Sequence, residues 1–189
     1  MLETLHAKKD AVYGDAWRKR GETLSIFPNI ARKYDRLEIA ATQGELFQAA
    51  TGKLSRTVEP LLDTVADLAI YALKYLTFLA EQQRTTFPSE LDASLCSDFN
   101  GALRQTRLAL SSRKDGTPVG NHLDETFRRI SGEMERLEQI LVGSGPVVTP
   151  DVKVRAAFAL AVFSLVLLDQ LVSYLPAAWA AFVAEVDEL

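Results

Sequence analysis

The pattern of apolar and polar positions along this chain is helical almost throughout. Apolar residues recur every three or four positions, as on one face of an α-helix, and almost no stretch shows the alternation expected of a strand. Gly, Pro and Ser clusters separate the helical stretches. The pattern predicts helices over residues 2–20, 28–42, 55–83, 89–111, 120–142, 150–174 and 176–187. The expected fold class is all-α, a bundle of six or seven helices.

The most apolar stretch, residues 156–168, is expected to be a core helix. Its sequence, AAFALAVFSLVLL, is followed by Asp169 and Gln170, so it falls short of the roughly 18 to 20 residues that a membrane span needs. A helix that is apolar on most sides requires neighbours on every face, in a bundle centre or a subunit interface. We therefore expect no membrane span, and we expect a homo-oligomer.

Two acidic pairs at helical spacing are the strongest candidates for chemistry. Asp35 and Glu38 are three residues apart on one predicted helix, and Asp63 and Asp67 are four apart on the next. Each spacing places both carboxylates on one helix face. Two antiparallel helices would then direct four oxygen ligands at one point, which suits a hard cation such as Mg²⁺ or Mn²⁺. All four are predicted metal ligands.

Other residues complete the predicted site. Glu59 extends the second acidic face, and either it or Glu38 is the expected general base for an attacking water. Basic and aromatic side chains would contact phosphates and stack on a base. The candidates for substrate binding are Lys9, Tyr13, Trp17, Lys33, Arg36 and Tyr71. The competing interpretation treats Lys33 and Arg36 as solvated helix charges and Trp17 as a core residue.

Composition limits the classes of ligand. The formal net charge is −4 and 48% of the residues are hydrophobic, so the chain has a sizeable core and no general attraction for a nucleic acid duplex or anionic lipid. A nucleoside triphosphate bridged by metal fits an acidic pocket better. The single cysteine, Cys96, excludes an intrachain disulfide, and the first residues lack a secretory signal pattern. We expect a cytoplasmic protein.

Three strings carry a family resemblance. YGDAWRKRG precedes NIARKYDRL, and ExxxDTxxDLAxYA begins at Glu59. In this order, over about residues 8–80, they resemble the nucleotide modification associated domain 1 family, which looks related to the MazG-like all-α NTP pyrophosphatases. The resemblance implies an antiparallel helix pair that binds or hydrolyses nucleotides.

The MazG-like proteins cleave a nucleoside triphosphate to the monophosphate and pyrophosphate, with magnesium held by ExxE on one helix and ExxD on the next. The corresponding pairs in this chain read DxxE, at Asp35 and Glu38, and DxxxD, at Asp63 and Asp67. The resemblance therefore implies the same activity with a changed ligand set.

The two halves of the chain show a faint repeat. MERLEQI echoes YDRLEIA at an offset of 100 residues, and the second copy has Phe163 and Leu167 at the positions of Asp63 and Asp67. One interpretation is a degenerate internal duplication, with a nucleotide and metal unit at 1–84 and a second helical unit at 85–189 packed against it. The other is chance similarity between helices rich in Arg, Leu and Glu.

Two classes of function remain open from the sequence. The first is a metal-dependent nucleotide-binding protein that hydrolyses a (d)NTP. The second is a non-catalytic helical interaction protein in which the same acids form a solvated or salt-bridged face. Convergence of the four carboxylates would distinguish them.

Overall fold

The protein is an all-α bundle in a computed structural model that describes residues 1–53, 58–82, 87–89, 91–112, 123–143 and 150–188. The described residues form eight α-helices and contain no strand. The helices are α1 (Leu2–Tyr13), α2 (Phe27–Thr42), α3 (Glu45–Ala50), α4 (Val58–Glu81), α5 (Phe99–Ser112), α6 (Leu123–Leu141), α7 (Pro150–Tyr174) and α8 (Pro176–Glu188). The all-α prediction is confirmed.

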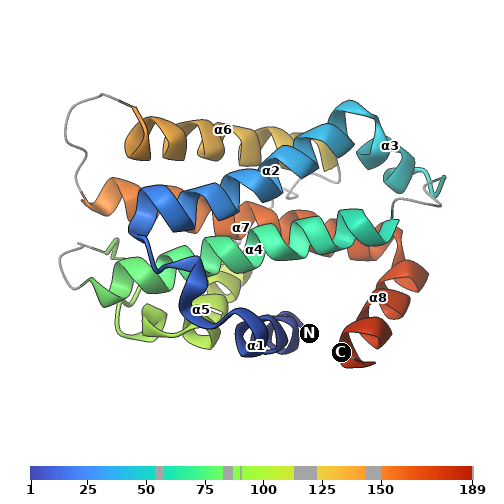
Figure 1. Cartoon of the computed structure of the whole chain (residues 1–189). Helices are drawn as coiled ribbons and strands as arrows, with labels where there is room; N and C mark the ends of the chain where they lie inside the picture. Colours follow the sequence, from blue (N-terminus) through green and yellow to red (C-terminus); the bar gives the residue numbers. More distant parts are fainter. Residues whose placement is uncertain (54–57, 83–86, 90, 113–122, 144–149, 189) are drawn as a thin grey trace.

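Four long helices make the body of the molecule. In Figure 1, α2 runs antiparallel to α4, and α6 runs antiparallel to α7. The two pairs meet mainly through α4 and α7, which lie at the centre of the bundle. On the outer side α2 packs on α6, where the rings of Tyr34 and Phe127 stack with centroids 6.2 Å apart. Helices α1, α5 and α8 flank the lower side, with the two chain ends near each other (Figure 1).

Helix α7 is the central core helix, as the apolar stretch predicts. Its length and composition would also allow it to cross a membrane, because the helix extends well beyond residues 156–168. However, 61% of its most apolar window is buried inside the bundle, where α4, α5 and α6 cover it. An apolar helix enclosed by other helices is what a soluble bundle contains at its centre.

Several helix boundaries differ from the sequence prediction. Helix α1 ends at Tyr13, not at residue 20, because Gly14 turns the chain with a φ of 50°. A short 3₁₀-helix, η1 (Gly14–Trp17), follows. The predicted helix over 89–111 begins only at Phe99. The short helix α3 was not predicted, and Gly44 starts it in the left-handed conformation.

A π-helix, η2 (Glu22–Ile26), leads into α2 and is anchored in the core. The buried Tyr75 hydroxyl of α4 donates a hydrogen bond to Glu22 Oε1 at 2.6 Å. Lys153 of α7 contacts Glu22 Oε2 at 2.8 Å. Burial and the neighbouring Glu22 carboxylate both raise the pKa of Tyr75 well above its usual range, so the phenol stays protonated as the donor.

One hydrophobic core extends through both halves of the chain. Helices α2 and α6 bury residues at the offset of 100, including Ile30 with Ile130 and Leu37 with Leu137. Any two amphipathic helices that face one core show this burial, whether or not they are duplicates. The division at residue 84 and the duplication itself stay predictions.

Candidate functional site

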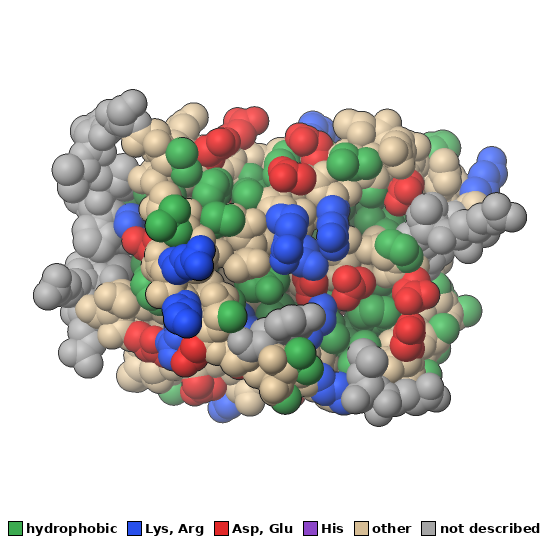
Figure 2. All heavy atoms as spheres, viewed as in Figure 1, with side chains coloured by type: hydrophobic (Ala, Val, Ile, Leu, Met, Phe, Trp, Pro, Cys, Tyr) green, Lys and Arg blue, Asp and Glu red, His purple; other side chains and the backbone are tan. Residues whose placement is uncertain are grey.

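A pocket of about 510 Å³ lies where α1 and η1 meet the α2–α4 pair. Its lining combines cations, two aspartates and two aromatic rings. The lining residues are Lys9, Ala16, Trp17, Asn29, Arg32, Lys33, Asp63, Asp67, Ile70, Tyr71 and Lys74. Figure 2 shows basic and acidic side chains gathered together on the face of the molecule along α2 and α4. We call this hollow the lysine–aspartate pocket.

Asp67 is the central charge of the pocket. Its side chain is only 5% exposed, and its two carboxylate oxygens contact different lysines, Oδ1 with Lys9 and Oδ2 with Lys33. A buried carboxylate requires such compensation, because an ion removed from water without a partner is costly. Lys33 is itself 9% exposed, so its pair with Asp67 is a true interior ion pair.

Lys9 links the two aspartates. Its ammonium group contacts Asp67 and also lies 3.2 Å from Asp63 Oδ1. Burial by itself would lower the pKa of Lys9, but hydrogen bonds and charge attraction from Asp67 and Asp63 outweigh it and raise the pKa above its ordinary value. Lys9 is therefore fully charged at neutral pH, and α1 is attached to α4 through it.

Lys74 supplies a further buried cation on the same side of α4. Its ammonium group contacts Asp10 of α1 and lies 5.1 Å from the centre of the Trp17 ring. Asp10 is in turn 3.5 Å from His6, whose ring stacks on Phe99. The aromatic faces and Asp10 stabilise a cation that is only 7% exposed.

The structure brings together six of the predicted site residues. They are Lys9, Trp17, Lys33, Asp63, Asp67 and Tyr71. Their roles differ in part from the prediction. Trp17 is a buried core residue at 9% exposure. Lys74 lies 5.1 Å from the centre of the Trp17 ring and 5.9 Å from the centre of the Tyr71 ring, so the half-buried Tyr71 is preferred as a platform for a base only because it is more accessible. The side chain of Tyr13 lies outside the described residues.

The other predicted acids lie elsewhere. Asp35 and Glu38 are exposed, because at 100° per residue they project well away from Lys33, which takes the inward position of α2. Glu38 accepts a hydrogen bond from Tyr34. Glu59 is exposed and interacts with Glu185 of α8. The expected convergence of four carboxylates is therefore not formed.

Arg36 belongs to a neighbouring hollow of about 290 Å³. This smaller hollow shares Asp63 with the lysine–aspartate pocket. The predicted substrate contact at Arg36 is thus displaced along the α2–α4 groove, away from Asp67. It stays a prediction for a ligand long enough to reach it.

Sequence reasoning missed Asn29, Arg32 and Lys74 as lining residues. A signal for Lys74 was present, since it lies seven residues after Asp67 and so continues the same helical face. Asn29 and Arg32 precede Lys33 by one turn and one residue, and nothing in the sequence singles them out from the other polar residues of α2.

The residues of the pocket do not fit the predicted Mg²⁺ or Mn²⁺ site. Across the described ranges, no group of three or more His, Cys, Asp or Glu side chains is placed to hold a metal ion. Both oxygens of Asp67 are already occupied by ammonium groups, whereas a divalent cation needs several free oxygen ligands. A metal requirement stays a prediction.

Comparison with known proteins gives one similar sequence. The chain is 38% identical over 93 residues to the Gene 30 protein of Bacillus phage SP01, an alignment covering 42% of this chain and 41% of that protein. The chain thus spans about two fifths of the length of that relative. No model of a protein family matches the chain, and no solved structure matches it significantly.

Proposed function

We propose that the protein binds a nucleotide, such as a nucleoside triphosphate, in the lysine–aspartate pocket. The observation that carries this proposal is the combination of Lys9, Lys33, Lys74 and Arg32 with the ring of Tyr71 in a hollow of about 510 Å³. Cations suit phosphate groups, an aromatic face suits a base, and the volume lies in the usual range of small-molecule sites.

The charge balance of the pocket favours an anion. Four cationic side chains line it against Asp63 and Asp67, and Asp10 outside the lining pairs with Lys74, so one positive charge remains after these three carboxylates are paired. The ammonium group of Lys9 has three hydrogen-bond donors. It can therefore donate to a phosphate group in place of, or in addition to, one of the two aspartates, so that Lys9 keeps an anionic partner when the ligand binds.

Hydrolysis to a monophosphate and pyrophosphate is the narrower part of the proposal. It is supported by the resemblance of residues 8–80 to proteins related to the MazG-like pyrophosphatases and by the position of Asp63, which is 39% exposed at the pocket wall. Asp63 is the candidate base for an attacking water. A dependence on Mg²⁺ or Mn²⁺ would show that ligand phosphates complete a metal site that the protein alone does not form.

A cytoplasmic location is also part of the proposal. Cys96 is buried, and burial raises its pKa to about 11, so this thiol is protonated and unreactive at neutral pH. Nothing in the described residues requires an oxidising compartment.

The test is a binding and turnover screen over canonical and modified NTPs and dNTPs, with and without Mg²⁺ or Mn²⁺. The wild-type protein is compared with the double variant Lys33→Met, Asp67→Leu, which replaces the central ion pair by apolar side chains. The matched control is Asp35→Asn, Glu38→Gln, which removes the acidic pair that lies outside the pocket.

Thermal stabilisation by a nucleotide that is lost in the Lys33/Asp67 variant and kept in the Asp35/Glu38 control would support the proposal. Release of pyrophosphate by the wild type and by the Asp35/Glu38 control, but not by the Lys33/Asp67 variant, would establish hydrolysis in this pocket. If turnover needs metal and disappears in the control, the four predicted carboxylates do act together. If no nucleotide stabilises the wild type, nucleotide binding is wrong.

Two observations favour a second candidate, the non-catalytic interaction protein. The four predicted carboxylates do not converge, since Asp35 and Glu38 lie outside the pocket. The charge of Asp67 is already compensated by Lys9 and Lys33, as expected for a salt-bridged structural face. For this candidate the screen gives no binding, and light scattering of the wild-type protein tests the expected homo-oligomer.

A further inference from the structure

A second hollow of about 450 Å³ opens directly beside the lysine–aspartate pocket. The two share three lining residues, Ala16, Asn29 and Arg32, so a ligand in the pocket can continue into this space. The remaining lining is Lys19, Arg20, Leu24, Ser25 and Pro28. We call this space the outer hollow.

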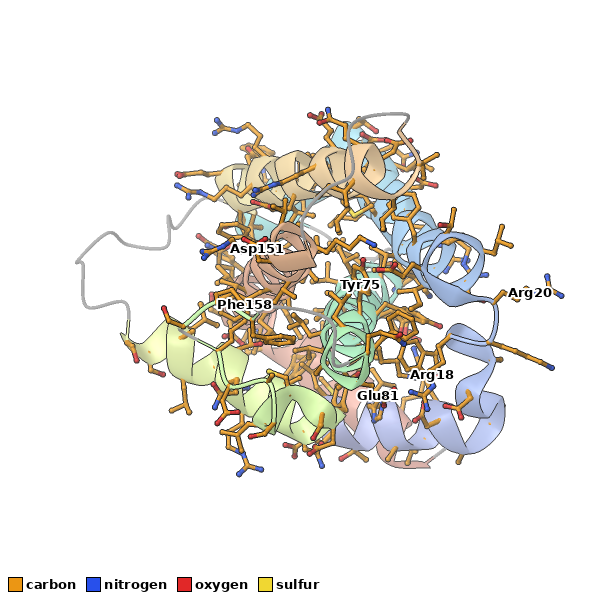
Figure 3. All side chains as sticks on the ribbon, turned by 90° about the vertical axis from the view of Figure 1, so that its left-hand side faces the viewer. Arg18, Arg20, Tyr75, Glu81, Asp151 and Phe158 are labelled. Carbon is orange, nitrogen blue, oxygen red and sulfur yellow. The ribbon has the colours of Figure 1, made fainter. Side chains whose placement is uncertain are left out.

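The outer hollow is purely cationic among its charged residues. Lys19, Arg20 and Arg32 are all exposed, and no acidic side chain is part of the described lining. Arg18 shows the contrast, because it pairs with Asp15 at 3.0 Å and also contacts Glu81. In Figure 3, Arg18 lies next to Glu81, whereas Arg20 extends outward from the bundle. The positive charge of the outer hollow is therefore not balanced by an acid in its described lining.

The backbone that carries these cations is held in place. The amide of Arg20 donates to the Ser25 hydroxyl at 3.0 Å, and the Asn29 side chain donates to the Ser25 carbonyl at 2.8 Å. The π-helix that contains Ser25 is tied to the core through Glu22, Tyr75 and Lys153. Extra-wide helical turns of this kind occur frequently at functional sites. The hollow is thus a formed feature of the fold.

We propose that the outer hollow is a subsite for the terminal phosphates of a nucleoside polyphosphate, held by Lys19, Arg20 and Arg32. This rests on the proposed nucleotide binding, with the base end in the lysine–aspartate pocket, and it makes the number of phosphates the basis of selectivity. A monophosphate in the pocket can meet only the shared Arg32, whereas the tail of a triphosphate extends toward Lys19 and Arg20 and carries the charge that matches them.

The experiment uses inorganic tripolyphosphate as the probe, so that it does not depend on the identity of the base. Its affinity is measured by calorimetry for the wild type and for the double variant Lys19→Gln, Arg20→Gln. A control variant, Arg104→Gln, Arg128→Gln, loses two exposed cations from α5 and α6. Equal melting temperatures of the three proteins confirm that these surface changes leave the fold intact.

We expect the Lys19/Arg20 variant to bind tripolyphosphate about tenfold more weakly, and the control to bind it as the wild type does. General attraction is not a sufficient source of binding, because the whole chain carries a net charge of −4. No binding to the wild type, or an equal loss in both variants, would overturn the subsite.

The outcome for the subsite is separable from the outcome for the pocket. If a nucleoside monophosphate binds while tripolyphosphate affinity is unchanged in the Lys19/Arg20 variant, the subsite is wrong and the nucleotide pocket stands. If tripolyphosphate behaves as expected and no nucleotide binds, the outer hollow is a polyphosphate site and the nucleotide proposal fails.

Discussion

The two helix pairs of the bundle share an arrangement and differ in chemistry. The α2–α4 pair buries Lys33, Asp67 and Lys74. In the α6–α7 pair, Phe163 and Leu167 stand at the positions of Asp63 and Asp67, and Leu167 is fully buried. The position of Lys33 is taken by Glu133. Both pairs contribute one long helix to the centre of the bundle. Similar backbone packing therefore accepts a charged seam or an apolar one, provided that buried charges are paired.

A buried charged seam need not stabilise a bundle more than an apolar one does. An interior ion pair loses hydration energy that its attraction recovers only in part, and apolar replacements are often neutral or stabilising. A chain that needed only a bundle would gain by having the α6–α7 chemistry in both halves. The proposed nucleotide pocket would give the charges of α2 and α4 a role that stability alone does not.

Glu133 is the position at which the charges of the α2–α4 and α6–α7 pairs differ most. It stands on α6 at the offset of 100 from Lys33, and its Oε2 is buried without a hydrogen-bond partner among the described residues. Burial raises its pKa, which the nearby Arg136 only partly counters. The α6–α7 pair thus has an acid where the first pair has a base.

The largest change in stability is expected when the α6–α7 pair is given the buried carboxylate that the α2–α4 pair has at Asp67. Leu167→Asp should lower the free energy of unfolding by about 4 kcal/mol at neutral pH, because the new carboxylate would be buried without a lysine partner. Chemical denaturation measures it, with Leu167→Asn as the uncharged control of similar size. A cost equal to that of the control would show that this seam tolerates charge.

Removing one charge from the first pair should have the next largest effect. Asp67→Ala is expected to cost about 3 kcal/mol, because it leaves Lys33 buried without its carboxylate. The double variant Lys33→Met, Asp67→Leu should unfold within about 1 kcal/mol of the wild type, since both charges leave together. Denaturation curves of the two variants decide the point. A double variant as unstable as the single one would contradict the comparison.

The smallest change in stability is expected from the titration of His6, which lies beside Asp10 near the α2–α4 pair. Burial first, and then the charge of Lys74, lower the pKa of His6, while Asp10 raises it less. The unfolded chain then binds a proton more readily than the folded one, so stability is complete above about pH 6.5 and falls as the pH drops below it. We expect a loss of less than about 1 kcal/mol between roughly pH 7 and pH 5.5.

The measurement for His6 is the difference between wild type and His6→Gln in denaturant midpoints over that pH range. A wild type that gains stability on acidification, relative to the variant, would contradict a lowered pKa of His6. Lys9 should contribute no slope in this range, because its pKa is raised and its pairing is lost only at alkaline pH, above its ordinary value.

Much of the fold followed from local patterns. The spacing of apolar residues predicted α2, α4, α6, α7 and α8 nearly to their ends, because a helix that buries one face must repeat its apolar positions at 3.6 residues. The errors fall where a single glycine or a tight turn decides. Gly14 ended α1 early, and the six residues of α3 are too few to show a period.

About half of the residues predicted for the site line the pocket. Asp63, Asp67 and Tyr71 were found because their spacing on one helix fixes their common face. Asp35 and Glu38 also share a face, but the sequence does not state which face of α2 meets α4. Packing chose the face that carries Ile30, Lys33 and Leu37, because it places two large apolar residues in the core.

The sequence by itself determined the five helices α2, α4, α6, α7 and α8, the all-α class and which residues share a helix face, since these depend on interactions a few residues apart. Only the tertiary structure decided that Lys9 and Lys33, not a second pair of carboxylates, meet Asp67. The physical reason is that the rotation of each helix about its axis is set by the combined burial of all its neighbours. That sum includes α1, whose contact with α4 joins residues more than fifty positions apart.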